Sequence, residues 1–166
     1  MMAPGHPPVG LRDSKQLTPP RRELLFQFLI ETCLAHSVGQ AEVAEIDKMG
    51  IARASLLAMA RAVEGLHPAA QALIVDAFLV PGLGLPQLAF ARADQSCPAV
   101  MAASIVAKVT RDRLMVDLDV RHPGYGFAHH KGYGTASHQS ALRAAGRCRA
   151  HRLSFAPIRA LDPLPG

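Results

Sequence analysis

The chain has 166 residues, of which 49% are hydrophobic and 19% charged, and this length and composition are typical of one folded domain with a real core. The formal net charge is +5, and the excess lies in residues 101–166, which hold 10 Lys or Arg against 4 Asp or Glu, whereas residues 1–100 hold 8 against 9. No apolar run reaches the roughly 18–20 residues that cross a bilayer, and the N-terminus does not resemble a secretory signal, so we expect a cytoplasmic protein without a membrane partner.

The first part of the chain predicts two helices separated by a strand. Residues 1–10 are rich in Pro and Gly, and we expect them to be disordered. Thr18 before Pro19 predicts a capped helix start, and apolar residues at helical spacing extend this helix over 18–35. We expect a short strand over 36–43 and a second helix over 44–64.

The second part predicts an α/β domain. Two apolar strands are expected over 72–78 and 85–94, each with an aspartate at its carboxyl end. A helix over 98–120 should cover them with Val100, Ala103, Ile105 and Val109. A Gly-rich loop over 122–135, a helix over 136–145 closed by Gly146 and a packed segment over 153–161 complete the chain. Helices alternating with strands indicate a mixed sheet flanked by helices.

Asp76 and Asp94 are the candidate metal ligands, because the carboxyl ends of strands in such a sheet collect ligands. Two carboxylates held close together repel each other unless a cation lies between them, and Mg²⁺ or Mn²⁺ prefers oxygen ligands. The alternative is that each aspartate caps the turn that follows it.

Two further segments carry residues that suit a polyanion. The loop HHKGYG offers Lys131 for a phosphate and Tyr133 for stacking on a base or sugar, although such a loop is often only a tight turn. Asp13, Ser14 and Lys15 precede a helix, where they form either a phosphate cradle or an ordinary capping turn. The basic C-terminal half is equally compatible with a nucleic acid and with a solvated surface. His129 and His130 point apart in an extended chain, which argues against a shared metal.

Several long segments resemble bacterial ribonuclease HII, in unbroken order from about Gly10 to Ala160. They are GLRDSKQLTPPRRELLF, AASIVAKVTRDRLM, YGFAHHKGYGTASH and HRLSFAPI. The resemblance implies a ribonuclease H-like domain over 11–161, followed by a tail at 162–166. It also implies an endonuclease that cuts the RNA strand of RNA–DNA hybrids and nicks DNA duplexes at embedded ribonucleotides, and we expect it to act as a monomer.

The resemblance also assigns site residues. The family holds Mn²⁺ or Mg²⁺ with four carboxylates, of which the third matches Asp76 and the fourth matches Asp94. The tyrosine that reads the RNA–DNA junction matches Tyr133. The family's Asp-Ser-Lys segment near the substrate backbone implies nucleic-acid contacts, and further candidate phosphate contacts are basic residues of the second half. The nucleic-acid-binding candidates are Ser14, Lys15, Lys108, Arg111, Lys131 and Tyr133. Asp112 matches a helix acid outside the carboxylate set.

The sequence departs from the family pattern at its start. The family's first strand carries Asp-Glu-Ala-Gly-Arg-Gly, which supplies the first two carboxylates and the backbone that reads the 2′-hydroxyl, and this motif is not in the sequence. After the third acid the family usually has Gly-Asn, where this chain has Ala77 and Phe78, and before the fourth it has Lys-Gly, where this chain has Arg92 and Ala93. We therefore predict a poor or inactive nuclease. The alternatives are an active enzyme with a mis-assigned start, a non-functional truncated product and a nucleic-acid-binding remnant.

Overall fold

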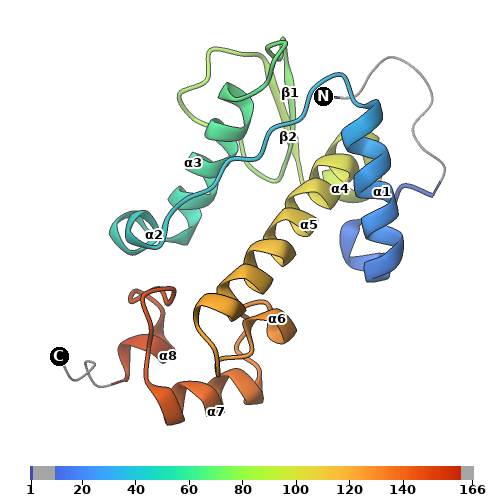
Figure 1. Cartoon of the computed structure of the whole chain (residues 1–166). Helices are drawn as coiled ribbons and strands as arrows, with labels where there is room; N and C mark the ends of the chain where they lie inside the picture. Colours follow the sequence, from blue (N-terminus) through green and yellow to red (C-terminus); the bar gives the residue numbers. More distant parts are fainter. Residues whose placement is uncertain (2–9, 162–166) are drawn as a thin grey trace. The chain divides into compact units, whose positions relative to one another are not determined.

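The computed structural model describes Met1 and residues 10–161, and its elements follow the order shown in Figure 1. The elements are η1 (Ser14–Gln16), α1 (Pro19–Thr32), α2 (Val43–Met49), α3 (Ile51–Glu64), β1 (Leu73–Asp76), β2 (Gln87–Phe90), α4 (Ala93–Ser96), α5 (Pro98–Arg121), α6 (Phe127–His130), α7 (Ala136–Ala145) and α8 (Ala156–Arg159). The expected α/β class is confirmed, because helices combine with a small parallel sheet. The Pro/Gly-rich start and the tail lie outside the described residues, apart from Met1 and Gly10.

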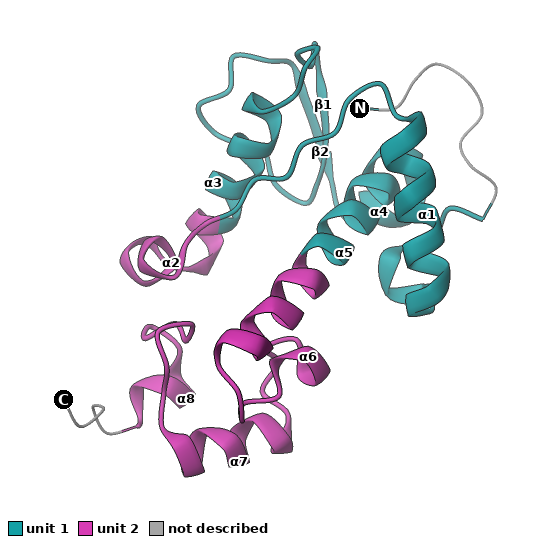
Figure 2. Ribbon diagram, viewed as in Figure 1, with its two compact units in different colours: residues 1–40, 55–110 teal, residues 41–54, 111–166 magenta. Residues whose placement is uncertain are grey.

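The chain divides into two compact units (Figure 2). Unit 1 comprises residues 1–40 and 55–110, and unit 2 comprises residues 41–54 and 111–166. Each unit has its own cluster of buried apolar side chains.

The core of unit 1 lies between α1 and α5. Leu25, Phe26 and Leu29 of α1 are buried together with a face of α5 on which Ile105 is fully buried. This core contains no residue of β1 or β2, so the prediction that α5 covers the strands was wrong, and Ala103 of the predicted face is exposed. Helix α1 begins at Pro19 as predicted, but the Thr18 side chain makes no capping hydrogen bond.

The segment 36–43, predicted as a strand, pairs with no strand. Gly39 instead lies so close to α3 that any side chain at this position would collide with the main-chain oxygen of Ala58. Arg61 of α3 fixes the segment by donating a hydrogen bond of 2.7 Å to the Gln40 carbonyl. An extended segment packed on a helix has the local backbone of a strand without its ladder, which is why the residue pattern was misleading.

The predicted helix over 44–64 is two helices. Glu42 and Glu45 form a capping box at the start of α2. The Glu42 side chain accepts a hydrogen bond from the main-chain N–H of Glu45, and the Glu45 side chain accepts one from the main-chain N–H of Glu42. Gly50 then takes a φ of 81°, in the region that favours glycine, and α3 begins at the next residue. The break is local to this one glycine.

Strands β1 and β2 are parallel, with Ile74 opposite Leu88 and Asp76 opposite Phe90. Alternate residues of a strand share a face, so Ile74, Asp76, Leu88 and Phe90 lie on the same side of the sheet. The three apolar members of this set are 47%, 59% and 37% exposed, in that order. Asp76 therefore stands on an apolar surface that the described residues leave open.

Unit 2 has a core of Met115, Tyr125, Phe127, Leu142 and Ile158. Helix α7 has the predicted bounds and ends at Gly146, whose N–H bonds to the Leu142 carbonyl. The predicted packing of 153–161 is confirmed by the burial of Ile158.

A carboxylate of α2 fixes the chain before α8. Asp47 accepts hydrogen bonds of 2.9 and 2.8 Å from the N–H groups of Leu153 and Ser154, more than 100 residues later in the sequence.

No helix within the described ranges combines the length and hydropathy that a membrane span requires.

Candidate active site

Asp76 and Asp94 are brought to the same end of the sheet. Asp76 is the last residue of β1, and its Oδ1 accepts a 2.9 Å hydrogen bond from the N–H of Ala93, the residue before Asp94. Asp94 itself lies in the first turn of α4, so the predicted strand over 85–94 was wrong in its second half. Strand β2 ends at Phe90, and Arg92 turns the chain with a φ of 61°.

Lys15 lies beside Asp94, with 3.8 Å between its Nζ and a carboxylate oxygen. The Lys15 side chain is 79% exposed and that of Asp94 is 15% exposed, so the ammonium faces water while the carboxylate is mostly enclosed. An ion pair whose ammonium group faces water contributes little to stability. The lysine is therefore able to exchange this partner for another anion.

The turn at residues 13–16 is an ordinary capping turn, one of the two predicted possibilities. Asp13 caps η1, with its Oδ1 accepting a 2.9 Å bond from the Lys15 N–H. Arg22 holds the turn onto α1 by donating hydrogen bonds of 3.0 and 2.9 Å to the carbonyls of Ser14 and Leu17. Ser14 is buried, whereas Lys15 projects into solvent. Of the two predicted contacts in this segment, Lys15 is the accessible one.

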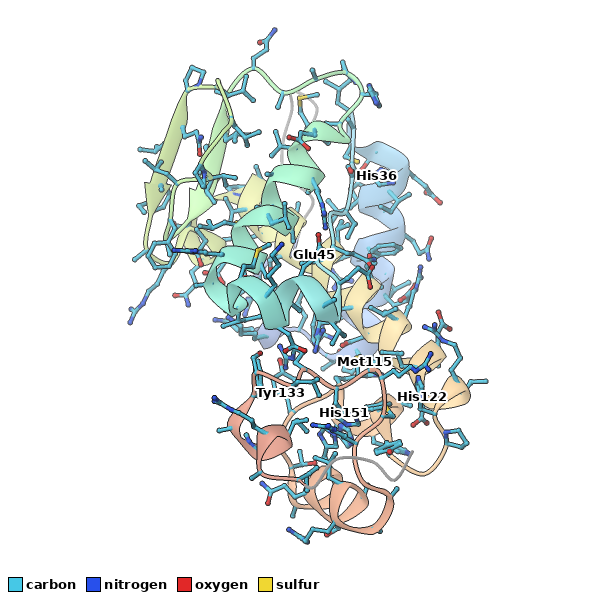
Figure 3. The ribbon with its side chains drawn as sticks, turned by 90° about the vertical axis from the view of Figure 1, so that its left-hand side faces the viewer. His36, Glu45, Met115, His122, Tyr133 and His151 are labelled. Atoms are coloured by element: carbon cyan, nitrogen blue, oxygen red, sulfur yellow. The ribbon has the colours of Figure 1, made fainter. Side chains whose placement is uncertain are left out.

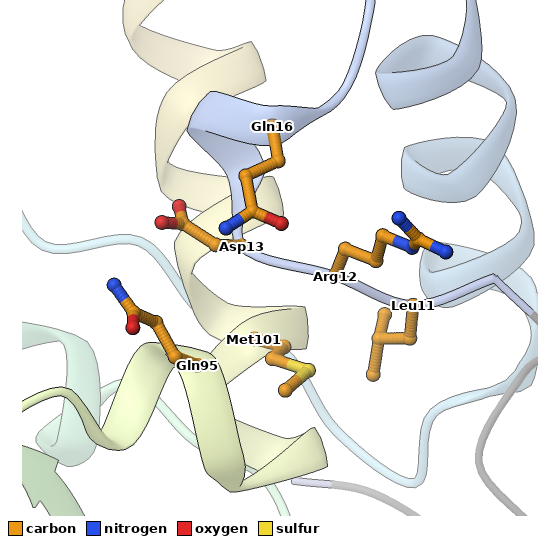
Figure 4. A pocket seen from close by; sticks show the side chains of 6 residues that line it. All are labelled: Leu11, Arg12, Asp13, Gln16, Gln95 and Met101. Atoms are coloured by element: carbon orange, nitrogen blue, oxygen red, sulfur yellow. The ribbon is translucent and has the colours of Figure 1, made fainter.

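A pocket of about 240 Å³ opens beside this turn (Figure 4). Its lining comes from the turn and from the start of the α4–α5 region: Leu11, Arg12, Asp13, Gln16, Gln95 and Met101. Gln95 directly follows Asp94, so the pocket adjoins the carboxylate end of the sheet. Its amide and guanidinium groups suit a polar ligand.

The remaining candidates lie mainly in unit 2. Arg111 donates a 3.1 Å hydrogen bond to the Lys131 carbonyl, and the Lys131 Nζ donates one of 3.3 Å to the Asp112 carbonyl. Tyr133 follows in the same loop and is 63% exposed (Figure 3). Lys108 lies on the part of α5 that belongs to unit 1 and is partly buried. The structure thus joins Arg111 to the Lys131 loop and Lys15 to Asp94.

Unusual backbone conformations occur next to several of the candidate site residues. Among the described residues other than glycine, a positive φ occurs at Ala77, Arg92 and Lys131. Ala77 directly follows Asp76, Arg92 precedes Asp94 by two positions, and Lys131 lies in the Tyr133 loop. Such conformations cost on the order of 1 kcal/mol and tend to cluster at functional sites.

The chain matches the ribonuclease HII family over residues 6–158. The chain belongs to this family. It is 45% identical over 159 residues to ribonuclease HII of Shewanella amazonensis, which covers 96% of this chain and 77% of that protein. It is also similar to the crystal structure of ribonuclease H2 from Pyrococcus horikoshii, with a TM-score of 0.73 and 28% identity over 91% of this chain and 79% of that one. The expected family, fold and enzyme class are confirmed.

Family membership gives one local departure a physical explanation. Ribonucleases HII usually have glycine after the third acid, and the residue at this position here, Ala77, has a φ of 68°. Glycine adopts this conformation without the steric cost that a Cβ brings. The glycine of the family is thus a backbone requirement, and Ala77 meets it at some cost in stability.

The ribonuclease HII family generally uses divalent metal ions, and the chemistry of Asp76 and Asp94 suits them. Both supply carboxylate oxygens, and Mg²⁺ is commonly bound by one or two carboxylates together with water and substrate phosphates. In the chain as described, no group of three or more His, Cys, Asp or Glu residues is arranged to hold a metal. Asp76 and Asp94 therefore remain candidate ligands that could supply part of a coordination sphere.

A cluster of buried histidines in unit 2 was not predicted from the residue pattern. His130, His138 and His151 are each less than 10% exposed, and the His138 and His151 Nε2 atoms lie 3.2 Å apart. Burial lowers the pKa of His138, and it lowers the pKa of His151 from 6.5 to about 4. These histidines are separated by 8 and 13 positions and lie on α6, on α7 and in the segment before α8, so the periodicity of a single helix or strand does not relate them.

These shifts predict a loss of stability in acid. Because the folded pKa of His151 lies below its unfolded value, the unfolded chain binds more protons as the pH falls from about 6.5 to 4. The quantity to compare is the free energy of unfolding of wild type minus that of His151→Asn, measured by urea unfolding. We expect this difference to fall by on the order of 2 kcal/mol between pH 7.5 and 4.5. His129→Asn, at an exposed neighbouring histidine, is the control. An equal pH dependence for both variants would contradict the prediction.

Proposed function

We propose that the chain hydrolyses the RNA strand of RNA–DNA hybrids and nicks DNA duplexes at embedded ribonucleotides. The observation that carries the proposal is the match to ribonuclease HII over residues 6–158, together with Asp76 and Asp94 at one end of the sheet. The similar proteins are named as a ribonuclease HII and a ribonuclease H2. We further propose that the protein is a cytoplasmic monomer that serves RNA breakdown and DNA repair.

The residues of this chain divide the work as follows. Asp76 and Asp94 would hold Mn²⁺ or Mg²⁺, which when bound supplies activation of water and stabilisation of the leaving oxygen. Lys15 leaves Asp94 to pair with a substrate phosphate, and Lys108, Arg111 and Lys131 add phosphate contacts. Ser14 would support the contact between Lys15 and the substrate phosphate, because the two residues share one turn.

Recognition of RNA would rest on the Tyr133 loop and on the 2′-hydroxyl. An exposed tyrosine can stack on a sugar or base at the junction between RNA and DNA. The 2′-hydroxyl is the group that separates RNA from DNA at a given position. Phosphate contacts would set the affinity for the duplex, whereas contacts with the junction and the 2′-hydroxyl would set the position of cleavage.

A cleavage assay tests the proposal. Three labelled duplexes of one sequence are compared: an RNA–DNA hybrid, a DNA duplex with one ribonucleotide and an all-DNA duplex, each with Mn²⁺, Mg²⁺ or a chelator. We expect metal-dependent cutting of the first two only, and the measured rate tests the prediction, made from the departures from the family pattern, that the nuclease is poor or inactive. Binding of the hybrid without cutting under any metal would replace the proposal by the nucleic-acid-binding alternative, and cutting of the all-DNA duplex would reject the assigned specificity.

Replacement of Tyr133 by alanine is expected to weaken binding of the single-ribonucleotide duplex. Loss of one stacking contact corresponds to roughly 1–3 kcal/mol, or about 5- to 150-fold in Kd. Tyr133→Phe keeps the ring and should stay close to wild type. Fluorescence anisotropy with a labelled duplex measures both. If the phenylalanine variant lost as much affinity as the alanine variant, the hydroxyl rather than stacking would be responsible.

A further inference from the structure

The three buried histidines of unit 2 form a histidine chain, in which one link is a ring stack and the other a hydrogen bond. His130 and His138 stack with ring centroids 4.1 Å apart, and His138 and His151 meet through their Nε2 atoms at 3.2 Å. The Phe127 ring lies 5.3–5.8 Å from all three rings. Helices α6 and α7 and the segment before α8 each supply one histidine.

The main-chain partners fix which nitrogen of each ring carries the hydrogen. The Tyr133 carbonyl, 3.0 Å from the Nδ1 of His138, can only accept, so this nitrogen carries the hydrogen and the Nε2 of His138 has the lone pair. The Nδ1 of His151 lies 3.0 Å from the Cys148 N–H, which can only donate, and 3.3 Å from the Cys148 carbonyl, which can only accept. Because the contact with the N–H is the shorter one, we assign the hydrogen of His151 to Nε2. One hydrogen is thus available for the contact between the two Nε2 atoms, from His151 to His138.

His130 is fixed in the same way. Its Nε2 lies 2.8 Å from the Tyr125 carbonyl and therefore donates, and its Nδ1 accepts a 3.1 Å hydrogen bond from the Gly132 N–H. Both nitrogens of all three rings have a hydrogen-bond partner, and all three rings are neutral in this arrangement. The hydrogen-bonding groups of the histidine chain are therefore all used without a bound ion.

The histidine chain ends on the loop that carries Tyr133. His130 holds the Gly132 N–H and His138 holds the Tyr133 carbonyl, so the two imidazoles fix the main chain on both sides of the Tyr133 Cα atom. The same carbonyl also accepts the N–H of Thr135 at 2.8 Å. The Tyr133 side chain remains 63% exposed. Buried polar contacts therefore set the direction of an exposed ring.

We propose that His138, oriented by His151, is a positioning residue that holds Tyr133 in the conformation required to stack on the nucleic acid. The proposal rests on the proposed function for the role of Tyr133 but not for the geometry of the loop. A neutral His138 is required, because a second hydrogen on its Nε2 would face the Nε2 hydrogen of His151 at 3.2 Å.

Two substitutions of His138 separate positioning from packing. In His138→Asn, the amide nitrogen takes the place of Nδ1 and can still donate to the Tyr133 carbonyl. In His138→Gln, the amide oxygen takes the place of Nε2 and can still accept from His151, but the contact to Tyr133 is lost. Both variants remove the ring, so a purely structural role predicts similar effects.

The chain contains two tyrosines, and both lie in unit 2, which makes fluorotyrosine labelling informative. Tyr125 is buried and donates a 3.1 Å hydrogen bond to the Gly146 carbonyl, so its ¹⁹F signal reports on the core. The Tyr133 signal reports on the loop. We expect His138→Gln to shift or broaden the Tyr133 signal while the Tyr125 signal stays, and His138→Asn to leave both near wild type. Equal effects of the two variants on the Tyr133 signal would overturn the proposal.

A measurement on the unchanged protein covers the case in which a variant fails to fold. Long-range ¹H–¹⁵N NMR distinguishes the two neutral forms of histidine. We expect hydrogen on Nδ1 of His138 and on Nε2 of His130 and His151, and a hydrogen on Nε2 of His138 would overturn the proposal. Titration with a single-ribonucleotide duplex then separates the two ideas. If the ¹⁹F results hold but no duplex binds, the proposed function fails and the positioning of the loop stands. If duplex binds equally to both variants, positioning for recognition fails.

Discussion

Asp94→Asn is expected to lower the rate of ribonucleotide-directed cleavage by at least about 100-fold, and Asp76→Asn should have a comparable effect. Both substitutions replace an anionic oxygen ligand by a neutral amide. Residues that merely support metal ligands commonly contribute about 10- to 100-fold, so loss of a carboxylate itself should exceed that range. Single-turnover cleavage of the single-ribonucleotide duplex measures the effect.

The fold should survive these changes. The amide oxygen of an asparagine at position 76 can still accept the Ala93 N–H, which keeps β1 joined to α4. Asp112→Asn is the matched control, because the resemblance to the family implies that this acid lies outside the carboxylate set. We expect the control to stay within about threefold of wild type. An Asp94→Asn variant as active as this control would remove Asp94 from the catalytic assignment.

Ile105→Ala is expected to lower the free energy of unfolding by about 3 kcal/mol. Ile105 is fully buried in the core between α1 and α5, and deletion of a buried aliphatic side chain costs about 2–5 kcal/mol through lost transfer energy and the cavity that remains. Urea unfolding followed by circular dichroism gives the value.

The control for this prediction is Leu24→Ala on α1 in the same unit. Leu24 is 63% exposed, so we expect a change within about 0.5 kcal/mol. The comparison also tests the core itself, because the residue pattern alone does not distinguish Leu24 from the buried Leu25. Equal losses at positions 24 and 105 would mean that the face of α1 is wrongly assigned.

Long, periodic elements could be predicted from the sequence, and features that depend on distant contacts could not. The bounds of α7 and nearly those of α5 followed from apolar spacing and from the closing glycine. The face that α5 buries was predicted wrongly, because its partner is α1 and helical periodicity does not name a partner. Likewise, residues 36–43 have the backbone of a strand, but Gly39 packs against a helix.

The candidate site was predictable to a similar extent. Asp76 is the last residue of a short apolar strand, and this local signal placed it correctly at the strand end. The position of Asp94 in α4 depends on the left-handed turn at Arg92, a non-glycine residue whose type does not reveal that conformation. The histidine chain depends on a ring stack between His130 and His138 and on a hydrogen bond between His138 and His151, 13 residues apart, and no short-range pattern encodes such contacts.

The apolar face of the sheet has a practical consequence for handling the protein. A basic half retains nucleic acid during purification, and high salt is the usual means of removing it, because salt weakens phosphate contacts. Salting-out ions such as sulfate also strengthen the association of exposed apolar surfaces, and Ile74, Leu88 and Phe90 present such a surface. Chloride should therefore strip the polyanion without promoting self-association, whereas ammonium sulfate should precipitate the protein through the same face that carries Asp76.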